Sequence, residues 1–197
     1  LLNYIGLNLV QFEKFNDAIN YYDQAISIDE KSIESMYLKS IALWSIDKQD
    51  DAINCLDNAI KIDPDYLDAI LLKGQIYRDQ KKFENALNCF RTIINIDQTY
   101  VDALFEIGNV YKDLRKTDKS IEAYEKFIEV VRKNELSDRD NQILRTNEYL
   151  NWVREKGETV TFNPRENPQY WQWSTRSEYF LGKDGNERKE LEPGTLL

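Results

Sequence analysis

Histidine is missing from this 197-residue sequence, which has only two cysteines, one methionine and four prolines. Without histidine, the chain lacks the commonest general base and metal ligand of proteins. The two cysteines lie far apart in the sequence and have no histidine partners, so they indicate neither a zinc site nor a Cys–His nucleophile. No glycine-rich phosphate loop between a strand and a helix is recognisable. The sequence therefore predicts a protein that is not an enzyme and that uses no cofactor or metal.

Long apolar runs are missing too: none approaches the roughly 18 residues of a membrane span. The first residues do not follow the basic, apolar, small-residue order of a signal peptide. A net charge of −9 and a pI near 4.7 argue against binding to nucleic acid or to anionic lipid, both of which need a basic surface. We therefore expect a basic or neutral partner, although acidity also serves simply to keep a protein soluble.

What the sequence does contain is one pattern that returns four times, at an interval of about 34 residues. Four sets of residues recur at that interval and define the repeat. They are Gly6, Ser40, Gly74 and Gly108; Ala18, Ala52, Ala86 and Ser120; Tyr22, Leu56, Phe90 and Tyr124; and Ala25, Ala59, Ile93 and Phe127. Each unit has the pattern of two helices joined by a short polar turn.

The third unit carries Ile70, Gly74, Tyr77, Ala86 and Phe90 at the spacing of the tetratricopeptide signature. Over about residues 1–134 the chain resembles that family. The chain departs from the signature at Lys39 and Lys73, which stand where the family prefers leucine, and only Pro64 of the four terminal prolines is present. The small residues let the two helix backbones cross closely, and the large ones fill the space beside them. A stack of such pairs buries a surface that one pair alone cannot.

The resemblance implies an all-α right-handed superhelix, a tetratricopeptide solenoid. We expect units at 1–32, 33–66, 67–100 and 101–134, followed by a capping helix at 135–157. Ile143, Leu144, Asn147, Leu150 and Val153 mark the inward face expected for that helix. Because Leu1 already lies inside a helix pattern, we also expect a fragment with possible repeats upstream.

The segment 158–197 has a different, aromatic-rich composition, with prolines near its start that exclude a continuing helix. It suits an irregular or β-hairpin tail, or the start of a truncated domain. Its candidate contact residues, for this molecule or for a neighbour, are Trp171, Trp173, Tyr179 and Phe180.

Cys55 and Cys89 occupy equivalent places on the second helices of two successive units. Stacked helices lie about 8–10 Å apart, which is too far for a disulfide without backbone movement. We therefore expect two reduced thiols, as suits a cytoplasmic chain.

In this family the first helix of each pair lines a concave groove, which the resemblance makes the expected binding site. The candidate groove residues, taken by helical spacing, are Tyr4, Leu7, Glu34, Tyr37, Leu38, Ile41, Trp44, Asp68, Leu71, Gln75, Arg78, Asp102, Phe105, Asn109 and Lys112. Tyr37 and Trp44 are the anchors we expect to matter most, because rigid aromatic side chains dominate binding energy.

One family subtype grips the C-terminal carboxylate of heat-shock chaperones with Lys, Asn and Arg. Here those positions read Asn3, Leu7, Leu38, Asp68 and Leu72, or, one unit later, Tyr37, Ile41, Leu72, Asp102 and Glu106. Neither set supplies the cations that a carboxylate needs. The sequence therefore disfavours the chaperone clamp.

These observations predict an adaptor or scaffold that binds a protein or peptide segment with apolar anchors and basic flanks. Two alternatives stay open. The aromatic tail could fill the groove, in the same molecule or in a neighbour, giving autoinhibition or self-association. The repeats could also be the scaffold arm of a larger protein, including an enzyme.

Overall fold

A computed structural model of the protein describes residues 1–134 and 139–156. Within these residues the regular structure is entirely α-helical, and all of them belong to one compact unit, Leu1–Val160. The helices are α1 (Leu2–Gln11), α2 (Phe15–Ile28), α3 (Ile33–Ser45), α4 (Gln49–Ile62), α5 (Leu67–Asp79), α6 (Phe83–Ile96), α7 (Val101–Asp113), α8 (Thr117–Lys133) and α9 (Asp140–Lys156).

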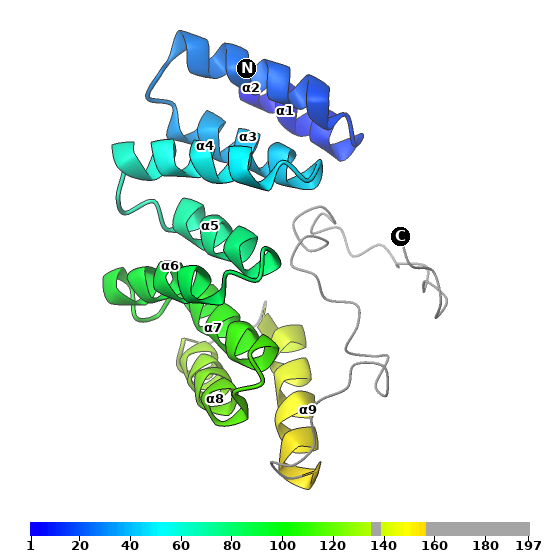
Figure 1. Ribbon diagram of the computed structural model, residues 1–197, viewed down its shortest axis with the longest axis vertical. Coiled ribbons are helices and arrows are strands. Elements are labelled where there is room, and N and C mark those ends of the chain that lie inside the picture. Colours follow the sequence, from blue (N-terminus) through cyan, green and yellow to red (C-terminus); the bar gives the residue numbers. More distant parts are fainter. Residues whose placement is uncertain (135–138, 157–197) are drawn as a thin grey trace. The chain divides into compact units, whose positions relative to one another are not determined.

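The first eight helices form four hairpins that stack in chain order (Figure 1). We call α1, α3, α5 and α7 the inner helices, and α2, α4, α6 and α8 the outer helices. Each inner helix packs on the outer helix that follows it in the chain. Each outer helix except α8 also packs on the next inner helix, while α8 packs on α9. The hairpins therefore share one continuous core.

Each hairpin closes where a small residue of the inner helix faces a large residue of the outer helix. Gly6 faces the ring of Tyr22, and Gly74 faces the ring of Phe90. In the second hairpin, fully buried Ser40 and Leu56 occupy the equivalent positions. A larger inner residue is thus matched by a smaller outer one, since a buried contact holds a limited volume.

The turn inside each hairpin contains one residue with a left-handed backbone. Glu13, Asp47, Lys81 and Arg115 have φ values of 58°, 63°, 59° and 56°, and they occupy the same position in successive repeats. This conformation favours glycine because it brings Cβ close to the following carbonyl oxygen. None of the four positions carries glycine, so each turn includes a moderate strain.

The two lysines that depart from the family signature connect successive hairpins. Lys39 of α3 forms an ion pair with Asp23 of α2, at 2.5 Å between Nζ and Oδ1. Lys73 of α5 pairs in the same way with Asp57 of α4. Both lysine side chains are about four-fifths buried, which makes these pairs part of the packing between units. Asp23 and Asp57 recur at the same repeat interval as the two lysines. Each lysine therefore has a carboxylate to pair with, which explains why lysine can replace leucine at this position.

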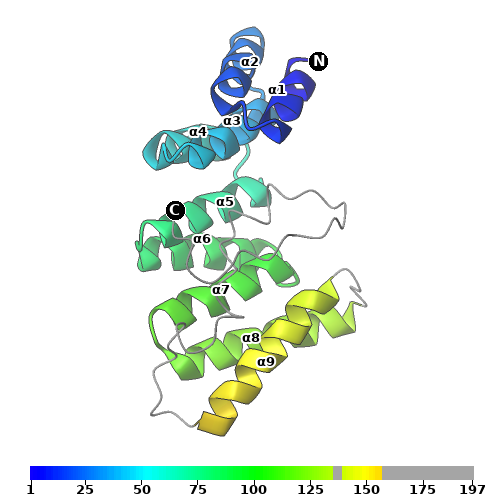
Figure 2. The ribbon, with the colours of Figure 1, turned by 90° about the vertical axis from the view of Figure 1, so that its right-hand side faces the viewer.

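The outer helix of the fourth hairpin is longer than its counterparts: α8 has 17 residues, against 14 for α2, α4 and α6. Helix α9 lies against α8 (Figure 2). Its buried residues are Thr146, Tyr149, Leu150 and Val153.

The inward face predicted for α9 is therefore partly wrong. Leu150 and Val153 are buried as expected, but Leu144 is 60% exposed, and Ile143 and Asn147 are half-buried. Thr146 and Tyr149, which the prediction omitted, face inward instead. The physical reason is a small rotation of the helix that seats the Tyr149 ring edge-on against Tyr124 of α8, at 5.5 Å between centroids.

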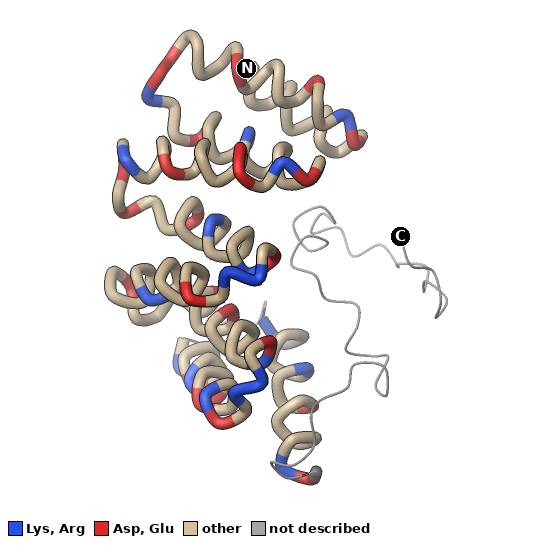
Figure 3. Tube along the Cα trace, viewed as in Figure 1, with Lys and Arg blue, Asp and Glu red and all other residues tan. Residues whose placement is uncertain are grey.

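Cys55 and Cys89 are both free thiols. Charged side chains of both signs are distributed along the stack (Figure 3). The proposed tail with Trp171, Trp173, Tyr179 and Phe180, and with it the hairpin expected there, lies outside the described residues.

Candidate partner-binding face

A row of carboxylates marks the start of three inner helices. Glu34, Asp68 and Asp102 each stand at the second residue of α3, α5 and α7, at the repeat interval. Acidic side chains are stabilised there by the partial positive charge of a helix N-terminus. The repeat thus places one negative charge in each of the last three units along the same edge of the inner-helix face.

Two carboxylates of this row accept hydrogen bonds from neutral groups. The Asn3 amide donates to Glu34 at 3.2 Å, and the Tyr100 hydroxyl donates to Asp68 at 2.6 Å. Since neither donor carries a charge, these two bonds leave the negative charges in place.

The third carboxylate holds a cation. Arg139, just before α9, donates from Nη2 to Oδ2 of Asp102 at 2.8 Å, and its Nη1 forms an ion pair with Oδ1 at 2.7 Å. Burial raises the pKa of Asp102, although the charge of Arg139 and its hydrogen bonds act in the opposite direction. This forked pair is the strong form of a guanidinium–carboxylate contact. The edge of the inner-helix face can therefore accommodate an arginine side chain.

Aromatic side chains lie beside the carboxylate row. The rings of Tyr37 and Tyr66 are 5.5 Å apart and tilted by 57°. Burial raises the pKa of Tyr66 to about 12, and the charges of Asp68 and Glu34 add to the effect. Burial and the hydrogen bond to Asp68 likewise raise the pKa of Tyr100. Carboxylates interleaved with neutral phenol rings suit a cation, which both kinds of group attract.

Further along the inner helices, the polar residues form a buried network around Glu106. That carboxylate is 2% exposed and accepts hydrogen bonds from Gln75 at 3.0 Å, Arg78 at 3.1 Å and Asn109 at 3.2 Å. Arg78 also donates to Asp113 at 2.7 Å. The network connects α5 to α7, and it pairs the guanidinium of Arg78 with the two carboxylates of Glu106 and Asp113.

The network continues into the last hairpin. The Tyr124 hydroxyl of α8 donates to the side-chain oxygen Oδ1 of Asn109 at 2.6 Å. Lys112 lies over the Tyr149 ring of α9, at 5.6 Å from its centroid. Burial lowers the pKa of Lys112, and the nearby positive charge of Arg78 lowers it further. The two cations of the candidate face are thus engaged in structural contacts, so neither is placed to receive a carboxylate.

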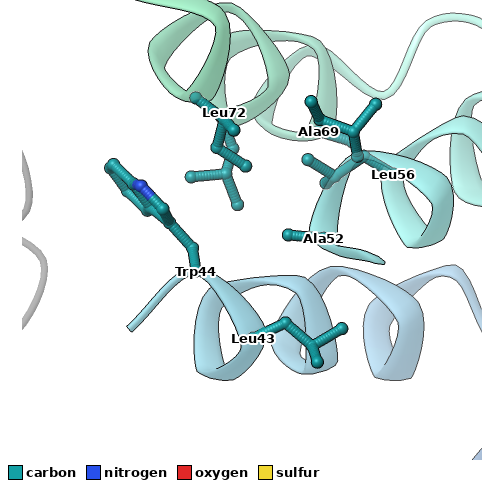
Figure 4. Packing of buried hydrophobic residues seen from close by; sticks show 8 residues of the cluster. Leu43, Trp44, Ala52, Leu56, Ala69 and Leu72 are labelled. Carbon is teal, nitrogen blue, oxygen red and sulfur yellow. The ribbon is translucent and has the colours of Figure 1, made fainter. Parts of the chain in front are cut away.

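Four candidate residues are buried, so the expectation that they are presented to a partner is wrong for this structure. Trp44, the main one, is 0% exposed and packs in a cluster that includes Leu72 of the next unit (Figure 4). Its indole nitrogen donates to Asp79 at 3.0 Å. Leu71, Gln75 and Asn109 are also buried, in the core cluster or the Glu106 network.

The other candidates keep at least part of their surface. Tyr4, Leu7, Glu34 and Asp68 are exposed. The remaining candidates are half-buried: Tyr37, Leu38, Ile41, Arg78, Asp102, Phe105 and Lys112. The ring of Phe105 packs against the ring of Phe127, at 5.3 Å between centroids.

Tyr66 and Tyr100 belong to this face but are not among the residues predicted for it from the sequence. A signal was present, since both directly precede an inner helix and occupy equivalent positions of two successive repeats. The roles of Glu106 and Arg139 were not predicted either, because no repeat position indicated them.

Models of the tetratricopeptide repeat match residues 2–32, 33–66 and 101–134, and a second model of the same repeat matches 74–115. Together these matches span more than half of the chain. The chain belongs to the tetratricopeptide repeat family. Its fold is accordingly an all-α tetratricopeptide superhelix, and its general role is that of a protein–protein interaction module.

Solved structures agree with this fold. A crystal structure of MamA protein is 25% identical, with a TM-score of 0.62, and the match covers 69% of this chain and 74% of that one. A tetratricopeptide repeat protein from Parabacteroides merdae ATCC 43184 is 17% identical, with a TM-score of 0.66, over 79% of this chain and 58% of that one. Comparison with curated proteins finds no match.

A third structure contains a ligand. The first tetratricopeptide domain of Spaghetti (RPAP3), bound to the HSP90 peptide SRMEEVD, is 18% identical, with a TM-score of 0.54, over 57% of this chain and 92% of that one.

Neither a membrane-spanning helix nor a metal-binding group is found in the part of this tetratricopeptide protein that the structure describes, residues 1–134 and 139–156. None of its helices there combines the length and the apolar surface that crossing a membrane requires. No three acidic or cysteine side chains within those ranges are grouped so that they could hold a metal ion.

Proposed function

We propose that this protein is a non-catalytic adaptor whose inner-helix face binds a segment of another protein that carries lysine or arginine next to apolar anchors. The observation that carries the proposal is the forked pair of Arg139 on Asp102. Asp68 and Glu34 repeat that carboxylate in the two preceding units, and they accept hydrogen bonds from the neutral donors Tyr100 and Asn3. Lysine or arginine side chains of a partner could therefore pair with these two carboxylates as Arg139 pairs with Asp102.

The apolar anchors of such a segment would meet Tyr37 and Ile41 of α3, which are half-buried. Tyr37 keeps the anchoring role that the sequence suggested. The equivalent role of Trp44 is withdrawn, since its ring lies in the core. A cytoplasmic location, inferred from two reduced thiols, belongs to the same proposal.

The ligand of the Spaghetti (RPAP3) domain is an acidic chaperone peptide. We propose the opposite preference for this chain, because carboxylates stand at the edge of its inner-helix face. The peptide SRMEEVD is therefore a suitable negative probe.

Selection from a library of random twelve-residue peptides tests the proposal. The wild-type chain should enrich peptides that combine Lys or Arg with large apolar residues, and it should not bind SRMEEVD. The double variant Glu34→Gln, Asp68→Asn should lose the preference for basic residues, and Tyr37→Ala should weaken the selected peptides by about tenfold, as an aromatic anchor typically does.

The matched control removes two carboxylates from exposed positions of outer helices. The variant Asp51→Asn, Glu122→Gln changes the net charge by the same amount on α4 and α8. It should keep the wild-type selection. Equal loss in both double variants would mean that only the overall charge of the protein matters, and enrichment of acidic peptides would reject the proposal.

A further inference from the structure

One carboxylate of the row formed by Glu34, Asp68 and Asp102 differs from the other two in the group that it binds. Glu34 and Asp68 accept their hydrogen bonds from an amide and a phenol, which are neutral. Asp102 instead holds the guanidinium of Arg139, which lies just before α9. The last carboxylate of the row is therefore paired with a cation that belongs to the same chain.

The repeat explains why Asp102 takes a different donor. Tyr100, which donates to Asp68, directly precedes the inner helix α7. One repeat interval later the same position is Asn134, which follows the last residue of the longer helix α8. Because no tyrosine stands at that position, the hydrogen bond that Asp102 accepts comes from Arg139 instead.

The buried contacts of α9 lie away from Arg139. Among the described side chains of this helix, the buried ones are Thr146 and three residues that follow it, and Leu144, nearer the start, is 60% exposed. At 1.5 Å per residue, Thr146 lies about 10 Å along the helix from Arg139. Helix α9 can therefore stay packed on α8 (Figure 2) when the ion pair at its start is exchanged.

The surroundings of Asp102 favour a cation there, whichever chain supplies it. Burial raises the pKa of Asp102, Arg139 acts against that increase, and the charges of Glu106 and Asp68 add to it. The side chains of Arg139 and Asp102 are 26% and 29% exposed, so water reaches the pair and weakens it. An arginine of another polypeptide would make the same forked contact, and the exchange would replace one guanidinium by another.

We propose that Asp102 is a third guanidinium-binding position of the carboxylate row, that Arg139 occupies it as an internal competitor, and that an arginine of the partner segment displaces Arg139. This role rests on the proposed function, since it requires that the row receives basic side chains. The ligand of this position is arginine rather than lysine, because a guanidinium presents two parallel N–H groups to the two oxygens of one carboxylate. Arg139 thereby lowers the affinity for partners and favours those that carry a correctly placed arginine.

Selection from the same library of random twelve-residue peptides, carried out with Arg139→Gln, tests the proposal. The variant should enrich peptides that carry an additional arginine compared with those that wild type enriches. A labelled peptide selected by the variant should bind the variant about tenfold more tightly than wild type, as one charge-assisted contact allows. Fluorescence anisotropy measures both affinities. A second peptide, with the additional arginine replaced by lysine, should lose most of this difference.

Two further variants locate the origin of the gain. Asp102→Asn, added to Arg139→Gln, removes the carboxylate and should abolish the gain in affinity. Arg154→Gln is the matched control, because Arg154 of α9 forms an exposed ion pair with Glu125 of α8 at 2.7 Å. It changes the net charge by the same amount as Arg139→Gln, and it should select and bind peptides as wild type does.

Displacement of Arg139 can be observed directly in the wild-type chain. The Nε–H resonance of Arg139 is assigned in a nitrogen–proton NMR spectrum by its absence from the spectrum of Arg139→Gln. When the peptide with the additional arginine saturates wild type, this resonance should move toward the position of a free arginine side chain. A resonance that stays in place at saturation would contradict displacement.

The remaining outcomes separate this proposal from the proposed function. Equal selection and equal affinity for wild type and Arg139→Gln would overturn it and leave Arg139 as a structural anchor of α9, while the binding of basic segments would stand. A gain that survives Asp102→Asn would overturn it too, because newly exposed apolar surface would then be the cause. A gain that Arg154→Gln reproduces would assign the effect to net charge. Failure of every variant to enrich basic peptides would reject the proposed function, and this proposal with it.

Discussion

A Cβ atom placed on Gly74 would lie 2.5 Å from Cε1 of Phe90, closer than real side chains approach. The ring cannot move away, because Phe90 is fully buried. In the second hairpin the same two positions hold Ser40 and Leu56. Glycine opposite an aromatic ring and serine opposite leucine therefore fill the same limited space between the inner and outer helices.

This relationship predicts non-additive substitutions. Gly74→Ser should lower the free energy of unfolding by about 1–3 kcal/mol through overpacking. Phe90→Leu alone should cost about 1 kcal/mol because it leaves a small cavity. The double variant copies the second hairpin. Its loss of unfolding free energy should be smaller than the sum of the two single losses by about 1 kcal/mol or more. Urea unfolding measures all three, and additivity would contradict the explanation.

The hydroxyl groups of two equivalent tyrosines should contribute differently to stability. Within the described residues the buried Tyr22 hydroxyl has no hydrogen-bond partner, whereas Tyr124 donates to Asn109 at 2.6 Å. Tyr22→Phe should therefore leave the free energy of unfolding unchanged or raise it. Tyr124→Phe should lower it by about 1–2 kcal/mol, since Asn109 loses its partner. Thermal unfolding of both variants checks this, and a larger loss for Tyr22→Phe would be inconsistent with it.

The left-handed turn residues offer a route to stabilisation. Lys81→Gly should raise the free energy of unfolding by about 0.5–1 kcal/mol, because glycine adopts a φ of 59° without steric cost. Asp47→Gly should gain less, since aspartate tolerates this conformation better. Lys126→Gly is the matched control, because Lys126 lies within helix α8, where glycine costs about 1 kcal/mol. Guanidinium unfolding should rank the variants in that order.

Thiol reactivity should be low and should rise with pH. Burial raises the pKa of Cys89 to about 11, and the nearby charge of Lys73 only partly offsets it. Compared with an ordinary thiol of pKa about 8.5, the reactive thiolate at pH 8 should be more than about 100-fold scarcer. Iodoacetamide labelling followed by mass spectrometry should show slow modification at pH 8 that accelerates toward pH 11. Cys55→Ser isolates the Cys89 signal, and fast labelling at pH 8 would contradict the burial argument.

Much of the fold could be predicted from the sequence. The repeated ladders of small and large residues place Gly6, Gly74 and Gly108 against rings, and that contact by itself requires closely crossing helices. The same ladders predict four hairpins. That Glu34, Asp68 and Asp102 form one row also follows from the sequence, because they share one repeat position.

The sequence by itself determined which residues are equivalent, and hence the tetratricopeptide stack, because a repeated pattern forces each unit to pack as its neighbours do. Only the tertiary structure decided which side of each inner helix is covered. Trp44 and Leu71 are buried because the rotation between successive hairpins sets which side chains meet, whereas Leu144 is exposed because α9 turns Tyr149 toward α8. That rotation arises from the combined fit of many side chains across each contact, so no single repeat position encodes it.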